Sequence, residues 1–272
     1  MKKSFNNRLK EICELRNSRL CIGLDIDPNK INQKYDSNLS NVIDFTKDVV
    51  DATIDLCPVY KLNLAFYECY GSKGYQWMEK ILKHIDNRAL TIADGKRGDI
   101  GNTAEKYADS LFNHFGFDSV TLSPYMGIDS IAPFIEDRTR GSFVLCLTSN
   151  KGALDFQYNK YKNEPLFISV AKFCKKLNIK NNLGIVVGGT KPQSMEIISE
   201  NSSGLIWLIP GIGAQGGDLE SSIKISNKNG LGIINVSRGI LYSGDGSIDS
   251  IYNATKKYTN ETPRPIQGLR SV

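Results

Sequence analysis

The chain has 272 residues, 40% hydrophobic and 23% charged, which is enough to bury the core of one large α/β domain or of two smaller ones. Its net charge of +5 is small and its basic residues are scattered, so the composition argues against nucleic-acid binding and leaves a weak pull on anionic ligands. No apolar run approaches the ~18 residues that a membrane helix needs, and charges from Arg8 to Arg16 interrupt any signal-peptide core. The six cysteines are widely spaced, which predicts free thiols, no zinc site and a cytoplasmic protein.

Apolar residues alternate between helical and strand spacing along nearly the whole chain. The first pattern predicts an amphipathic helix over residues 5–16. Eight strand-like runs follow, starting near residues 20, 59, 89, 118, 142, 183, 205 and 232. The predicted helices after them cover 41–57, 74–85, 102–115, 127–136, 164–177, 191–201, 217–226 and 247–258, with a polar loop at about 149–163.

Strict alternation of strand and helix predicts parallel strands joined by right-handed crossovers. Eight such units in a chain of about 250 residues are typical of a TIM barrel. We therefore predict a TIM (β/α)8 barrel with an extra N-terminal helix. No linker or repeat divides the chain, so residues 1–272 are expected to form a single catalytic domain. A doubly wound sheet with more crossovers than usual is the alternative.

Polar residues concentrate at the predicted carboxyl ends of the strands, where the catalytic groups of a barrel lie. They are Asp25, Lys61, Asp94, Lys96, Ser149, Gln215 and Arg238. The third strand carries the densest group. Asp94 and Lys96 are two residues apart, so in an extended chain they face the same side. Asp99 follows within reach, and intervening glycines are expected to let the backbone turn around these charges.

Two late loops are suited to binding a phosphate. Residues 210–218 read P-G-I-G-A-Q-G-G-D and lead into a predicted helix, whose free N–H groups could bind an anion. After the eighth strand, Arg238 supplies a guanidinium. Loops after the seventh and eighth strands form the usual phosphate site of a TIM barrel.

Lys61 and Lys96, the two lysines at the predicted strand ends, could form an imine with a substrate or act as charged acids. An imine needs a neutral amine, and burial can lower the pKa of a lysine by about 3 to 5. A carboxylate at ~4 Å favours the ammonium by up to ~4 kcal/mol at an effective dielectric constant of about 20. One carboxylate would roughly cancel the effect of burial, and two would keep the lysine charged. Alternating Lys and Asp residues therefore favour a proton donor and electrostatic stabiliser.

These motifs resemble those of the orotidine 5′-phosphate decarboxylase family. D-G-K-R-G-D-I-G-N-T resembles the family signature D-x-K-x-x-D-I-x-x-T in the form of its longer bacterial subgroup. P-G-I-G-A-Q-G-G-D resembles the phosphate loop of the family, and C-I-G-L-D, S-P-Y-M-G-I-D-S and L-T-S-N-K-G-A-L-D-F-Q also resemble that subgroup. The matching blocks run from about residue 20 to 243.

The resemblance implies loss of CO2 from orotidine 5′-monophosphate to give uridine 5′-monophosphate, the last step of de novo pyrimidine synthesis, without metal or organic cofactor. It assigns protonation of C6 to Lys96, a place beside the substrate carboxylate to Asp94, and completion of the charged array to Lys61. It further implies a homodimer in which Asp99 and Thr103 reach the site of the partner subunit. The remaining implied contacts are Asp25 to ribose, Ser149 to the pyrimidine, Gln215 and Arg238 to phosphate, and Ile100, Pro210 and Gly211 to substrate.

Two other functions remain open at this point. A phosphosugar decarboxylase or aldol-type lyase on a related barrel would share D-x-K but use Mg2+, and a cation at Lys61 opposes metal binding there. A non-catalytic phosphate-binding barrel would bind a nucleotide without turnover.

Overall fold

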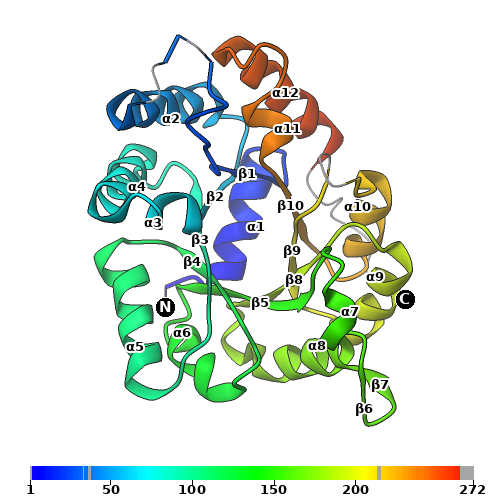
Figure 1. Cartoon of the computed structure of the whole chain (residues 1–272). Coiled ribbons are helices and arrows are strands. Elements are labelled where there is room, and N and C mark those ends of the chain that lie inside the picture. The colour runs from blue at the N-terminus through cyan, green and yellow to red at the C-terminus, as the bar shows by residue number, and fades with distance from the viewer. Residues whose placement is uncertain (1, 33, 36–37, 213–215, 264–272) are drawn as a thin grey trace.

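The computed structural model describes residues 2–32, 34–35, 38–212 and 216–263. Its centre is a closed barrel of eight parallel strands in the order β1-β10-β9-β8-β5-β4-β3-β2, in which β10 closes on β1 (Figure 1). The barrel strands are β1 (Leu20–Gly23), β2 (Val59–Asn63), β3 (Leu90–Arg97), β4 (Ser119–Leu122), β5 (Gly141–Leu147), β8 (Leu183–Val187), β9 (Ile206–Ile209) and β10 (Gly232–Val236). The predicted TIM barrel is confirmed, and all eight predicted strand runs belong to it.

Helices cover the outside of the barrel (Figure 1). The main ones are α2 (Leu39–Thr53), α4 (Gly71–Ile85), α5 (Gly101–Asp109), α8 (Leu166–Leu177), α9 (Pro192–Asn201), α10 (Leu219–Asn227) and α12 (Ile248–Glu261). The helix predicted over 102–115 ends its α-helical part at Asp109 and continues as a π-helical turn, η1 (Ser110–His114). The helix predicted over 127–136 is instead two short pieces, η2 (Ile128–Ser130) and α6 (Ala132–Ile135).

Several short elements were not predicted. They are α3 (Ala65–Glu68), α7 (Ala153–Phe156), the hairpin of β6 (Lys160–Tyr161) and β7 (Glu164–Pro165), η3 (Asn178–Lys180) and α11 (Arg238–Leu241). Each is at most four residues long, which is too short to show a periodic apolar pattern.

Helix α1 (Phe5–Leu15) closes the N-terminal end of the barrel, which confirms the extra N-terminal helix. Phe5, Leu9 and Cys13 are buried against inward-facing residues of the strands. The ring of Phe5 meets Phe143 edge to face, with 6.0 Å between ring centroids. A Cβ at Gly141 would lie 2.2 Å from the same ring, so only glycine fits there. Because α1 fills this end, the opposite end is left for a ligand.

A larger apolar layer lies between the strands and the outer helices. Trp77 and Trp207 are fully buried in it, and each indole N–H donates to a hydroxyl, that of Thr46 and of Ser202 respectively. Both tryptophans therefore serve packing. All six cysteines are free thiols, and no helix among the described residues is long and apolar enough to span a membrane.

Candidate active site

A cavity of about 440 Å³ opens at the carboxyl end of the barrel strands. Eight of the residues predicted for the site line it: Asp25, Lys61, Asp94, Lys96, Ser149, Pro210, Gly211 and Arg238. Their positions in the chain span more than two hundred residues, and the barrel brings them together because they lie in or just after six of its strands. Gln215 lies outside the described residues.

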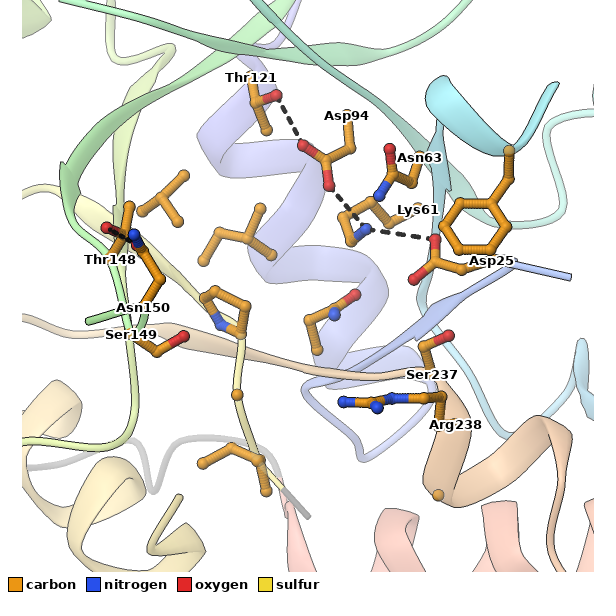
Figure 2. Close-up of a pocket in the computed structure, with 18 of the residues that line it drawn as sticks. Asp25, Lys61, Asn63, Asp94, Thr121, Thr148, Ser149, Asn150, Ser237 and Arg238 are labelled. Carbon is orange, nitrogen blue, oxygen red and sulfur yellow. Dashed lines mark hydrogen bonds and ion pairs between the residues drawn. The ribbon is translucent and has the colours of Figure 1, made fainter. Parts of the chain in front are cut away.

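Four of these residues form a continuous charged array. The Lys61 Nζ lies 2.8 Å from Asp94 Oδ2 and 3.6 Å from Asp25 Oδ1. The Lys96 Nζ lies 2.6 Å from Asp94 Oδ1, so Asp94 is held between two ammonium groups. Figure 2 shows Asp94 between Thr121 and Lys61, with Lys61 reaching on to Asp25. The alternation of charges predicted from the sequence is present in space.

The array fixes the charge of its two most buried members. Burial alone would lower the pKa of Lys61, but the carboxylates of Asp25 and Asp94 outweigh burial and raise this pKa above its ordinary value. Burial would likewise raise the pKa of Asp94, but Lys61 and Lys96 hold that pKa well below its usual range. Lys61 is therefore a charged ammonium and Asp94 a carboxylate at neutral pH. This charge state disfavours Lys61 as an imine-forming amine.

Strand β3 reaches the cavity through an irregularity that the sequence did not reveal. Its pairing with β4 shifts between Ala93 and Arg97, so that β3 carries more residues than the facing stretch of β4. Within this bulge Lys96 has a φ of +47°, in the left-handed region that costs a non-glycine residue roughly 1–2 kcal/mol. Asp94 and Lys96 thus face each other because of the bulge, and not because of the regular alternation that we predicted.

The glycines around these charges play a narrower role than predicted. Gly101 alone among Gly95, Gly98 and Gly101 has a positive φ, of +55°. Gly95 lies close to the side chain of Leu64, whose terminal methyl group would be 2.8 Å from a Cβ at this position and would have to shift. The left-handed turn at the centre of the motif is made by Lys96 itself.

The expected phosphate end lies where the seventh and eighth barrel strands finish. Pro210 and Gly211 follow β9, and Gly211 has a φ of +95° that favours glycine. Arg238 begins α11, with Ser237 between it and the end of β10, and Figure 2 shows its guanidinium extending into the cavity. One cation and a glycine turn therefore line the cavity at a different part of its wall from the charged array.

A scan against protein-family models matches residues 18–248 to the orotidine 5′-phosphate decarboxylase / HUMPS family. The chain belongs to this family. It is 38% identical to the orotidine 5′-phosphate decarboxylase of Herpetosiphon aurantiacus over 97% of this chain and 98% of that protein. It is 42% identical to that of Dehalococcoides mccartyi strain CBDB1 over 89% and 90% of the two chains. The solved Leishmania donovani OMP decarboxylase superimposes with a TM-score of 0.83 at 32% identity, over 95% of this chain and 97% of that one.

Three residues of the family signature lie away from the cavity of their own chain. Asp99, Ile100 and Thr103 are not among the residues that line it. The Asp99 carboxylate instead accepts the N–H of Ile100 at 2.8 Å, and the side chain of Ile100 is exposed. Within one chain the array therefore contains Asp25 as its second carboxylate, and the role of Asp99 stays a prediction.

Several residues that line the cavity were not predicted from the sequence. Asn63, Thr121, Thr148, Asn235 and Ser237 line the cavity, and all are polar residues at or near the end of a strand. The same criterion that found Lys61 could have found them, but small neutral side chains at strand ends are common and carry little signal alone. Two of the cavity's polar atoms, Asp25 Oδ1 and Ser237 Oγ, are buried without a hydrogen-bond partner among the described residues.

Proposed function

We propose that this protein decarboxylates orotidine 5′-monophosphate to uridine 5′-monophosphate and CO2, the last step of de novo pyrimidine biosynthesis, in the cytoplasm. The observation that carries the proposal is the array of Asp25, Lys61, Asp94 and Lys96 in a cavity that also holds Arg238. Such a cavity offers a cation for the phosphate and a fixed field of charges for the ring that reacts.

Binding would be anchored away from the reacting carbon. Arg238, Pro210, Gly211 and Gln215 would hold the phosphate, and Ser149 would contact the pyrimidine. A ribose hydroxyl could donate to Asp25 Oδ1, which is buried and accepts no hydrogen bond from any residue that the structure describes. Lys61 would touch the ribose as well. These remote contacts would supply binding energy that is used at C6.

The chemical step would break the bond between C6 and the carboxylate. The electron pair stays on C6 as a vinyl carbanion, CO2 leaves, and the ammonium of Lys96 gives its proton to C6. Asp94, held ionised by Lys61 and Lys96, would lie beside the substrate carboxylate and disfavour the ground state. The positive field of Lys96 would stabilise the carbanion as it forms.

We further propose that this step needs no metal. The position where a divalent cation could join Asp25 and Asp94 is taken by the buried ammonium of Lys61, 2.8 Å from Asp94. A second cation there would meet direct repulsion. The Mg2+-dependent phosphosugar lyase is disfavoured by the same contact.

We also propose a homodimer in which Asp99 and Thr103 complete the site of the partner subunit, with Ile100 beside them. Exposed apolar side chains support this, because Ile100, Tyr125, Met126 and Ile128 lie on the two segments that follow β3 and β4. Mixing an Asp99→Ala variant with a Lys96→Ala variant tests it. Hybrid dimers would regain one intact site and hence activity, whereas two inactive variants that stay inactive when mixed and refolded together would contradict a shared site.

The test of the reaction is the fall in ultraviolet absorbance of orotidine 5′-monophosphate with purified protein in EDTA. Turnover in chelator is expected, and Lys96→Ala should abolish it while uridine 5′-monophosphate still binds. Turnover only with Mg2+ and a phosphosugar would point to the lyase. Nucleotide binding without turnover under either condition would point to a non-catalytic barrel.

A further inference from the structure

Thr121, the third of the four residues of β4, touches both members of the Asp94–Lys96 pair. Its hydroxyl donates to Asp94 Oδ1 at 2.9 Å and accepts the backbone N–H of Lys96 at 3.0 Å. The side chain is 1% exposed, so this hydroxyl is shielded from bulk water. One buried oxygen therefore contacts the carboxylate of one catalytic residue and the backbone of the other.

The bulge explains why such a contact is needed. Between Ala93 and Arg97 the ladder to β4 is interrupted, and a residue in a bulge loses its regular backbone partner. The N–H of Lys96 finds its acceptor in the Thr121 side chain instead. This bond holds Lys96 in its left-handed conformation, from which Nζ reaches Asp94 at 2.6 Å.

The same hydroxyl also fixes the rotation of the Asp94 carboxylate. Oδ1 receives both Thr121 Oγ1 and Lys96 Nζ, while Oδ2 receives Lys61 Nζ. With donors on both oxygens, the carboxylate has one arrangement that satisfies all three. Preorganised charges of this kind are effective only when their supporting contacts fix the geometry.

We propose that Thr121 is a positioning residue, whose hydroxyl sets the distance and direction between Asp94 and Lys96 for the chemical step. The expected effect on reaction rate rests on the proposed decarboxylation. The expected effect on the geometry of Asp94 and Lys96 does not depend on it. Substrate anchoring at Arg238 does not involve Thr121, so its loss would slow the reaction more than it weakens binding.

The test compares Thr121→Val, which keeps the shape and removes the hydroxyl, with Thr121→Ser, which keeps the hydroxyl. Thr91→Val is the matched control, because the Thr91 hydroxyl bonds Asp118 at the other end of the same strand pair, away from the cavity. We expect Thr121→Val to lower kcat by about 10- to 100-fold with KM changed less than about threefold, a loss typical of a displaced catalytic group. Thr121→Ser should stay within about fivefold of the wild-type kcat, and Thr91→Val should lose stability but not kcat.

Crystal structures of Thr121→Val and Thr121→Ser give a readout that needs no activity. We expect Lys96 to leave the left-handed region, or its Nζ to move away from Asp94, in the valine variant alone. Wild-type kcat in Thr121→Val, equal losses in the serine variant, or a matching kcat loss in Thr91→Val would each overturn the proposal. If the wild type shows no turnover, the decarboxylase assignment fails, and an unchanged Lys96 in Thr121→Val would still overturn the positioning role separately.

Discussion

Replacement of Lys61 by Met should destabilise the fold far more than the same replacement of Lys96. At an effective dielectric constant of about 20, the contacts of Lys61 at 2.8 and 3.6 Å correspond to roughly 6 and 5 kcal/mol of attraction. The desolvation of a buried ammonium offsets several kcal/mol of this. Removal of one partner from a buried pair leaves uncompensated charge, so Lys61→Met should lower the free energy of unfolding by about 3–5 kcal/mol.

Lys96→Met is the control, because Lys96 contacts the same carboxylate from a side chain that is 47% exposed. Water can replace the lost ammonium there, so we expect a cost of at most about 1 kcal/mol. Urea unfolding at pH 7, followed by circular dichroism and by the fluorescence of the two buried tryptophans, measures both values. Addition of Asp94→Asn to Lys61→Met should recover part of the loss by removing one orphaned charge. Equal costs for the two lysine variants would refute the reasoning from burial.

Three further predictions follow from the same geometry. Arg238→Ala should raise KM for orotidine 5′-monophosphate by about 10- to 100-fold, as loss of a charge-assisted contact does. The kcat/KM for the nucleoside, which has no phosphate, should stay unchanged. An equal loss with the nucleoside would show that Arg238 does not bind the phosphate. Phe5→Ala should cost about 3–5 kcal/mol of stability in urea unfolding and leave kcat intact, because α1 lies at the far end of the barrel. Because the pKa of Asp94 is lowered in the folded protein, its contribution to stability is complete above the unfolded pKa near 3.9 and is lost as the pH falls through the folded pKa. Because the pKa of Lys61 is raised, its contribution is complete below the unfolded pKa of about 10.4 and is lost at higher pH. The difference in stability between wild type and Lys61→Met should therefore shrink as the pH falls below about 3.9, where the wild type begins to lose the contribution of Asp94; the same difference at pH 7 and pH 3 would contradict the assignment.

The barrel was predictable because its evidence is local and repeated. Each inner strand is an apolar run a few residues long, and each outer helix shows its own 3.6-residue periodicity. Eight such units constrain one another, since parallel strands with right-handed crossovers leave few topologies. The position of the lysines and carboxylates at strand ends then followed from the architecture, which is why Lys61 and Asp94 could be assigned to one site before any coordinates.

The features of the site that were not predicted depend on contacts between residues far apart in the chain. The bulge in β3 exists only against β4, and the left-handed Lys96 is supported by Thr121, which lies 25 residues further along. The sequence around Lys96 carries glycines that suggested the turn would fall on them. These features have no periodicity that a single sequence could display.

The closure of the barrel by α1 has a consequence for how the chain is made. During synthesis α1 and β1 leave the ribosome well before β10, but α1 packs on strands as late as β10, and β1 pairs with β10. The apolar face formed by Phe5, Leu9 and Cys13 therefore stays without some of its final packing partners while more than two hundred further residues are synthesised. Barrel closure through contacts so distant in sequence is slow, and it leaves hydrophobic surface exposed to aggregation in the meantime. The packing of α1 is thus completed only after β10 has formed.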